Sequence, residues 1–254
     1  MRPAEGVYHR LNPTTKLVIA FAAALIAFGV RGWSGPVGVL GVVGVTAAVA
    51  GIGRGMRPFV LATLPLIASI LIVNTFLYPD AHDVLFRVGP LAATGTGLAA
   101  ALQASLRVVA FALSVAVFSL TTPTDDLLVD LEHRGLGRRG VFVIGAAIRT
   151  IPRMAERAGE IVESQRARAL DTEGSLLRRV RGLVPLAGPL ILGALSDVEE
   201  RTMALEARAF SAPGRRTTLR PIPDTAGQRA VRWLVALGSL ALLAATAGGV
   251  ITPP

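Results

Sequence analysis

The sequence predicts an all-α membrane protein with about five transmembrane helices and a cytoplasmic domain of three further helices. The 254-residue chain is 52% hydrophobic and only 17% charged, and its mean hydropathy is +0.57. This composition is too apolar for an ordinary soluble domain of that length. Five stretches approach the roughly 20 apolar residues that a helix needs to cross a bilayer. Three charged segments with helical periodicity lie between the fourth and fifth of these stretches.

The expected transmembrane helices cover residues 15–31, 36–53, 58–78, 98–120 and 231–251. The first is short, but the long side chains of Lys16 and Arg31 at its ends can reach the membrane interface. It has no convincing signal-peptide cleavage site, so we expect a retained span. In the fourth helix we place Arg107 near the start, where it must face the interface or a protein neighbour.

Charge predicts the orientation of these helices, because basic residues concentrate on the cytoplasmic side of a membrane. They gather before the first span and between the second and third, at Arg2, Arg10, Lys16, Arg54 and Arg57. The loop around residues 78–90 holds two acidic residues and one arginine, which fits the outside. The prediction is therefore a multi-pass protein of the cell membrane with a cytoplasmic N-terminus.

The chain divides into transmembrane helices at 1–120, a cytoplasmic segment at 121–230 and a C-terminal transmembrane helix at 231–254. The cytoplasmic segment opens with a helix of about twelve residues, capped by Thr122 or Thr124 and ended by Gly135. Two longer helices follow at about 141–169 and 183–210. Proline, glycine and arginine then indicate a loop at 211–229.

Apolar residues of the second cytoplasmic helix recur at spacings of three and four, which indicates one apolar stripe opposite a charged face. This helix is too charged to cross a bilayer, but it can lie along the inner membrane face, with a kink at Pro152. In the third helix, residues 183–195 are uncharged but too few to span, so they are expected to be buried or interfacial. The stripe consists of Ile144, Ile148, Ile151, Ala155, Ala158 and Val162.

Several kinds of chemistry are excluded by composition. The chain has no cysteine, and its single lysine, Lys16, follows no glycine-rich loop, so a nucleotide-binding Walker A motif is absent. The net charge of +9 does not indicate nucleic-acid binding, because the arginines flank membrane spans and aromatic residues are few. His9, His82 and His133 lie in separate segments and predict no shared metal site. We expect no catalytic residue, no metal and no cofactor in this chain.

A short phrase occurs twice, as ARALDTEG from Ala167 to Gly174 and as ARAFSAPG from Ala207 to Gly214. A lone arginine near a helix C-terminus is usually explained by the helix dipole. Two equivalent arginines between small residues instead favour a docking device for two similar partner sites, since an arginine can make bidentate contacts with carboxylates. The candidate docking residues are Ala167, Arg168, Ala169, Ala207, Arg208 and Ala209.

Four segments in order resemble the transmembrane coupling component of energy-coupling factor transporters, the family that includes the cobalt-uptake permease. They are YHRLNPTTKL, TTPTDDLLVDLEHRGLG, IRTIPRMAERAGEIVESQRARALD and GPLILGALSDVEERTMALEARAF. The likeness covers most of the chain and is sharpest in the last segment. Family members show glycine where this chain has Ala169 and Ala209, and arginine where it has Thr14.

The resemblance implies a membrane scaffold with three coupling helices. These would join two ABC-type ATPases to a small hydrophobic substrate-binding membrane subunit, for uptake of a vitamin or a transition-metal ion. Arg168 and Arg208 would each enter a groove in one ATPase, and the partner ATPases would bind ATP and magnesium. The chain itself is then expected to be no enzyme.

Two alternative functions, a membrane-embedded enzyme and a solute-binding permease, would require features that differ from those of this sequence. A membrane-embedded enzyme acting on a phosphorylated lipid or isoprenoid should show clustered acidic residues for a metal near a membrane boundary, and the sequence has no such cluster. A permease that binds solute within its own spans should carry polar residues there. The spans hold almost none beyond Asn74, Gln103 and Arg107, which favours a scaffold.

Overall fold

The computed structural model describes residues 7–30, 32–78, 83–88, 91–167, 176–210, 212 and 222–248. It divides into two compact units, one formed by residues 1–135 with 222–254 and one by residues 136–221. The short helix after the fourth span thus belongs to the same unit as the apolar helices. Each unit is described by itself below.

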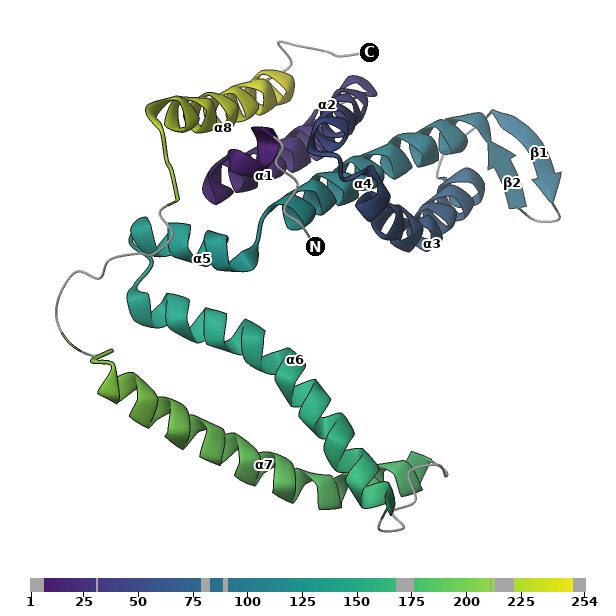
Figure 1. Ribbon diagram of the computed structural model, residues 1–254. Helices are drawn as coiled ribbons and strands as arrows, with labels where there is room; N and C mark the ends of the chain where they lie inside the picture. Colours follow the sequence, from purple (N-terminus) through teal and green to yellow (C-terminus); the bar gives the residue numbers. More distant parts are fainter. Residues whose placement is uncertain are drawn as a thin grey trace. The chain divides into compact units, whose positions relative to one another are not determined.

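The first unit contains most of the secondary structure (Figure 1). Its elements, in order, are η1 (Val7–Arg10), α1 (Pro13–Gly29), α2 (Ser34–Ala50), α3 (Gly53–Leu77), β1 (Val84–Val88), β2 (Leu91–Thr94), α4 (Gly95–Thr121), α5 (Thr124–His133) and α8 (Ala226–Ala247). The second unit consists of α6 (Arg138–Ala167) and α7 (Leu176–Ala207).

Helix α4 lies at the centre of the first unit. It packs against α1, α2 and α3, while α8 packs on α1. The residues buried at these contacts are small, and Ala27, Ala101 and Ala110 have no exposed surface at all. Small side chains let helix backbones approach closely, which is how helices associate within a membrane. Large apolar side chains such as Phe21 and Leu234 instead point outward, as expected of helices that face lipid.

The prediction of five apolar helices is confirmed. Among the described residues α3, α4 and α8 are long and apolar enough to cross a membrane, whereas α1 and α2 are apolar but have 17 residues each. Arg107 was wrongly expected near the start of its helix. Because α4 begins at Gly95 and ends at Thr121, Arg107 stands close to its middle.

Helices α1 and α4 run antiparallel, and a basic side chain of each helix donates a hydrogen bond to the C-terminal end of the other. Lys16 at the start of α1 donates from Nζ to the carbonyl oxygen of Thr121 at 2.8 Å, and Thr121 is the last residue of α4. Arg107 donates from a terminal guanidinium nitrogen to the carbonyl oxygen of Val30 at 3.4 Å, and Val30 caps α1. Carbonyls at a helix C-terminus lack partners within the helix and carry partial negative charge. Each helix thus supplies a cation to the C-terminal end of the other.

A β-hairpin that the sequence did not predict joins α3 to α4 (Figure 1). Strands β1 and β2 pair antiparallel, with Phe86 opposite Ala93. The Asp83 carboxylate accepts hydrogen bonds from the backbone N–H and the hydroxyl of Thr96, both at 2.7 Å. Phe86 also makes an edge-on contact with Phe76 of α3. These contacts attach the hairpin to the ends of both helices.

Helix α5 has the expected length but a different start. Neither Thr122 nor Thr124 caps it, because the N-cap residue is Pro123 and no side chain makes a capping bond. Asp125 and Asp126 stand in the first turn, where their negative charge is favourable near the N-terminal end of the helix dipole. Gly135 follows the helix with φ of +102°, a conformation that favours glycine.

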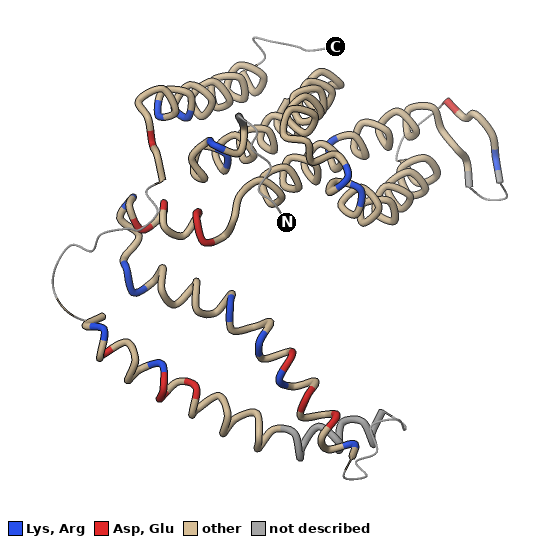
Figure 2. The backbone as a smooth tube through the Cα atoms, in the orientation of Figure 1, with Lys and Arg blue, Asp and Glu red and all other residues tan. Residues whose placement is uncertain are grey.

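The second unit is a pair of antiparallel helices. Both begin earlier than predicted, α6 at Arg138 and α7 at Leu176, and Pro152 lies inside α6 as expected. Basic and acidic residues both occur along the length of α6 and α7 (Figure 2). The loop expected at 211–229 is shorter at its far end, because α8 already begins at Ala226, where Thr225 accepts a capping bond from the backbone of Gln228. Most of residues 211–221 lie outside the described part of the chain.

Replacing Gly97 by alanine is expected to destabilise the contact between α3 and α4. A Cβ at this position would meet the Asn74 carbonyl oxygen, and it would lie 3.0 Å from Cβ of Tyr78. Overpacking of this kind costs about 1–3 kcal/mol. We expect a lower Tm in detergent for Gly97→Ala. Gly44→Ala is the control, because a Cβ there meets nothing within 4 Å, and an equal loss of Tm in both variants would contradict the prediction.

Candidate functional site

The second copy of the repeated phrase forms the C-terminal end of α7. The amide of Phe210 donates to the carbonyl of Leu205 at 2.9 Å, and the amide of Ala209 donates to the carbonyl of Glu206 at 2.9 Å. Ala209 has φ of +53°. This pair of bonds around a left-handed residue is a Schellman motif, which satisfies the last carbonyls of a helix. Ala209 occupies the position where glycine is usual in such motifs.

This geometry defines what the Ala-Arg-Ala sequence does at α7. Ala207 is the last helical residue, Arg208 is the half-helical residue after it, and Ala209 reverses the chain. All three are exposed. The guanidinium of Arg208 therefore leaves the helix at its negative end, with only small side chains beside it.

Phe210 ties this helix end to the start of α6. Its carbonyl oxygen accepts a hydrogen bond from Arg138 at 2.6 Å, and the Arg138 guanidinium lies 5.3 Å from the centre of its ring. Its ring also packs on Phe142 with centroids 4.8 Å apart. These contacts hold Arg208 at one defined end of the helix pair.

The first copy of the phrase begins at the C-terminal end of α6. Ala167 is the last residue of α6, while Arg168 and Ala169 lie outside the described residues. Because α6 and α7 are antiparallel and Phe142 contacts Phe210, Ala167 and Ala207 stand at opposite ends. The helix between Phe142 and Ala167 is roughly 40 Å long.

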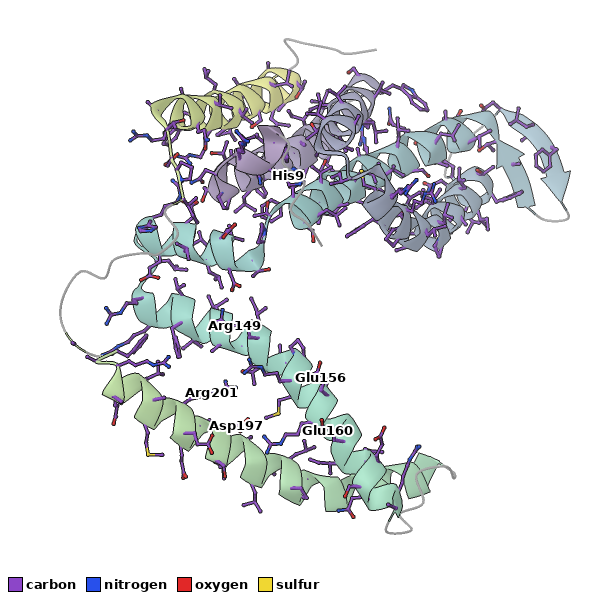
Figure 3. All side chains as sticks on the ribbon, viewed as in Figure 1. His9, Arg149, Glu156, Glu160, Asp197 and Arg201 are labelled. Atoms are coloured by element: carbon purple, nitrogen blue, oxygen red, sulfur yellow. The ribbon has the colours of Figure 1, made fainter. Side chains whose placement is uncertain are left out.

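The seam between α6 and α7 is polar. Arg157 of α6 donates to both carboxylate oxygens of Asp197 at 3.2 Å, and Arg201 of α7 donates to Thr150 at 3.0 Å. Asp197 and Arg201 lie on the side of α7 that faces α6 (Figure 3). Both partners of the Arg157–Asp197 pair are about 40% exposed, and such solvated pairs contribute about 1 kcal/mol or less.

The isoleucines of the predicted apolar stripe of α6 are not buried against α7. Ile144, Ile148 and Ile151 are exposed, Ile151 by 68%. The uncharged part of α7 was expected to be buried or interfacial, and its described side chains are mostly exposed within this chain. They include Ile191, Leu192 and Leu195. Both helices thus present apolar side chains that the chain itself leaves uncovered.

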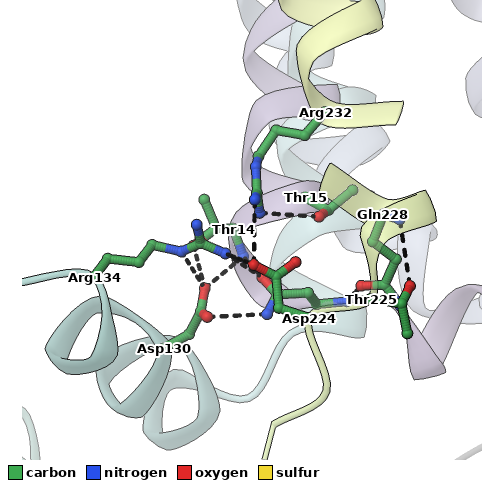
Figure 4. Close-up of polar contacts among 9 residues, drawn as sticks. Thr14, Thr15, Asp130, Arg134, Asp224, Thr225, Gln228 and Arg232 are labelled. Carbon is green, nitrogen blue, oxygen red and sulfur yellow. Dashed lines mark hydrogen bonds and ion pairs between the residues drawn. The ribbon is translucent and has the colours of Figure 1, made fainter. Parts of the chain in front are cut away.

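A polar junction joins the start of α1 to α5 and to the start of α8 (Figure 4). We use this name for Asn12, Thr14, Asp130, Arg134, Asp224, Gln228 and Arg232. Asp130 of α5 is 4% exposed and accepts from the Asn12 side chain at 2.9 Å, from the Thr14 hydroxyl and from Arg134 Nε at 3.1 Å. Two segments distant in sequence, the start of α1 and α5, therefore meet at one carboxylate.

Arg134 extends the junction to the last apolar helix. It contacts Asp224 at 3.2 Å, and Arg232 of α8 contacts the same carboxylate oxygen at 3.3 Å. The backbone N–H of Asn12 donates to the Gln228 side chain at 2.9 Å. Sequence reasoning noticed the N-terminal motif around Asn12 only as a family resemblance and missed Asp130. On a helix of that composition, Asp130 reads as an ordinary surface acid.

The junction lowers the pKa of Asp130. Burial raises the pKa of this carboxyl, but the hydrogen bonds from Thr14, Asn12 and Arg134, together with the Arg134 charge, outweigh burial and bring the pKa below its usual value. A carboxyl with a lowered pKa in the folded state stabilises the fold above its unfolded pKa of about 3.9. That contribution is lost as the pH falls through the lower folded value.

Asp130→Asn is therefore expected to lower stability at pH 7 by about 2 kcal/mol, the contribution of hydrogen bonds to a charged group. The difference from wild type should shrink as the pH falls below about 4, because the wild-type carboxyl then binds a proton first in the unfolded state and, at still lower pH, in the folded state as well. Thermal unfolding in detergent between pH 3 and pH 8 measures this. A deficit that stays constant over this range would show that the charge of Asp130 does not stabilise the junction.

Ala209→Gly is expected to stabilise the end of α7 by about 1 kcal/mol, because glycine adopts positive φ without the steric cost that a Cβ imposes. Slower hydrogen exchange at the Ala209 and Phe210 amide positions would report it. Ala204→Gly is the control, since Ala204 lies inside the exposed helix and glycine there should cost about 1 kcal/mol. Faster exchange in both variants would contradict the assigned geometry.

Comparison with known proteins shows the family. Residues 4–219 match the family model described as cobalt transport protein. The energy-coupling factor transporter transmembrane protein EcfT of Thermosediminibacter oceani is 28% identical, over 94% of this chain and 93% of its own. The protein of the same description from Limosilactobacillus fermentum is 29% identical, over 87% of this chain and 86% of its own.

A longer protein also contains a similar region. A putative ABC transporter ATP-binding protein of Bifidobacterium longum is 30% identical over 87% of this chain, which spans only 29% of that protein. The family model covers most of the chain, and its described helices include three that can cross a membrane. The chain therefore belongs to the cobalt transport protein family, as a membrane subunit of a transporter.

Proposed function

We propose that this chain is the scaffold that couples two ABC-type ATPases to a separate small substrate-binding membrane subunit, for uptake of a vitamin or a transition-metal ion. The observation that carries the proposal is the geometry of the helix ends on α6 and α7. The second Ala-Arg-Ala copy presents an exposed arginine on the end of α7, which a Schellman motif closes, and the first copy begins at Ala167, the last residue of α6.

The separation of the two copies suits two ATPase partners. Roughly 40 Å of helix separates the end of α6 from the contact that holds the end of α7, which is too far for the ends of both helices to enter one groove. An acidic groove on each of two ATPases would receive one guanidinium, and bidentate hydrogen bonds to a carboxylate would fix its orientation. Similarity to part of a longer ATP-binding protein supports an association with ATPases.

The apolar faces of α6 and α7 suit the substrate-binding subunit. Exposed residues such as Ile148, Ile151 and Leu192 would be covered by an apolar membrane protein, whereas the arginines at the helix ends would bind the ATPases. If ATP binding draws the two ATPases together, the two helix ends move with them. The polar, partly solvated seam between α6 and α7 lets their angle change at small cost.

The proposed orientation places these helices in the cytoplasm. The basic residues before α1 and between α2 and α3 would lie on the same side, and the hairpin β1–β2 would lie outside. The polar junction would then lie at the cytoplasmic face, because it joins the start of α1 to α5. It would transmit motion of the segment after α5 to α1 and α8.

Loss of both docking arginines is expected to detach the ATPases. Arg168→Ala or Arg208→Ala should each cost about 2–5 kcal/mol of ATPase affinity if the pair is buried and hydrogen-bonded. Pull-down of the two ATPases by the purified chain measures this, and the double variant should retain neither.

Arg166→Ala is the matched control, because Arg166 is an exposed arginine in the last turn of α6 and is not part of the repeated Ala-Arg-Ala phrase. It should bind the ATPases as the wild type does. Equal ATPase recovery with wild type and the double variant would overturn the proposed docking role.

A further inference from the structure

An apolar groove lies where α1, α4 and α8 meet. Its volume is about 420 Å³, and most of its wall comes from α1. Phe28 of α1 and Phe111 of α4 stack edge to face beside it, with ring centroids 5.9 Å apart. The lining residues are Phe21, Ala24, Leu25, Phe28, Gly29, Phe111 and Leu243.

The groove runs along the membrane part of the molecule. Two of its three walls, α4 and α8, are long and apolar enough to cross a bilayer. Phe21 is 65% exposed and Phe28 52% exposed beside it, so the groove opens to the side rather than into the interior. Hydrocarbon chains, not water, surround such a surface in a bilayer.

A positive charge lies next to one end of the groove, although Arg107 is not itself a lining residue. Arg107 precedes Phe111 by four residues on α4 and therefore lies on the same face, one turn away. Its guanidinium contacts the carbonyl of Val30, the residue next to Gly29 of the groove wall. An apolar wall of about two helical turns on α1, from Phe21 to Gly29, thus leads to one arginine.

The hydrogen bonds of Arg107 are incomplete. A guanidinium has five N–H donors, and the hydrogen bond to the Val30 carbonyl uses one of them at 3.4 Å. Nε is buried and has no hydrogen-bond partner among the described residues. A cation within a transmembrane helix is costly, and such residues usually mark a ligand or an ion pathway. Arg107 lies level with the C-terminal end of α1, because it contacts the carbonyl of Val30, which caps that helix. The hydrogen bond to the end of α1 accounts for one N–H group of Arg107. It does not explain why a charged side chain stands in a transmembrane helix.

We infer that the groove binds a glycerophospholipid, with an acyl chain along Phe21 to Phe28 and the phosphate at the guanidinium of Arg107. Charge complementarity selects this occupant. An apolar helix of a partner protein would cover the groove but would bring no acceptor to Arg107, whereas a phospholipid supplies a hydrocarbon chain and an anionic phosphate in one molecule. Arginine and phosphate form short charge-assisted hydrogen bonds.

The test uses the assembled transporter in proteoliposomes. The probe is a phosphatidylglycerol with a diazirine on its acyl chain, and peptide mass spectrometry locates the adducts after illumination. We expect adducts in residues 21–28 and at Phe111. A diacylglycerol with the same chain and diazirine lacks the phosphate and should label these positions at least about tenfold less, the effect of losing charge-assisted hydrogen bonds.

Arg107→Gln should lower labelling by phosphatidylglycerol to the level of the diacylglycerol. Arg54→Gln is the control, because Arg54 is an exposed arginine in the first turn of another apolar helix, and it should label like the wild type. Ala24→Phe fills the groove without changing its charge and should also abolish the adducts. This second variant keeps the test decisive if Arg107→Gln does not fold.

Three results would overturn the inference. One is equal labelling by both probes, which would remove the role of the phosphate. Another is unchanged labelling in folded Arg107→Gln and Ala24→Phe. The third is labelling of the isolated chain that disappears in the assembled transporter, which would assign the groove to a helix of a partner subunit.

Discussion

The Asp130 carboxylate is the interaction on which the first unit depends. It accepts hydrogen bonds from Asn12, Thr14 and Arg134, and Arg134 in turn contacts Asp224 before α8. Without this cluster, α5 would have little to attach it, because its ten residues bury only Leu128 and Asp130 itself. A charge so deeply buried is tolerated only when its partners are complete. Removing one partner would therefore disturb α1, α5 and α8 together.

The two units use opposite kinds of contact. Helices α1 to α4 are packed through small residues such as Ala27 and Ala110. Lys16 of α1 and Arg107 of α4 also donate hydrogen bonds to the C-terminal ends of α4 and α1, respectively. Among the described residues, α6 and α7 contact each other through the solvated Arg157–Asp197 pair and the Arg201–Thr150 hydrogen bond, and both helices expose isoleucines or leucines. A rigid first unit and a helix pair with a weak seam and uncovered apolar faces suit a scaffold whose remaining contacts come from other subunits.

Composition and periodicity predicted the helices well, because the length of an apolar run and its period are local properties. Features that depend on tertiary contacts could not be predicted from these local properties. The strand Val84–Val88 has five residues and is held by Asp83 and Phe76, neither of which marks a hairpin in the sequence. Asp130 lies four residues before Arg134, a spacing that is common for ion pairs on the surface of a helix. Only the contact with Asn12 in the folded chain shows that Asp130 is part of a buried cluster. The apolar stripe of α6 was identified, but its neighbour in space depends on how α7 packs.

The alanines of the repeated phrase separate two explanations for a small residue beside the arginine that we propose to dock. If glycine were required there for close approach of a partner backbone, alanine would obstruct docking at both copies. At Ala209 the structure gives another reason, because φ is +53° and the amide closes a Schellman motif. Alanine pays a steric cost of about 1–2 kcal/mol in that conformation, which the hydrogen bonds at the helix end and the packing of Phe210 on Phe142 can offset. The requirement at this position is then a chain reversal that leaves Arg208 exposed, and alanine satisfies it at reduced stability.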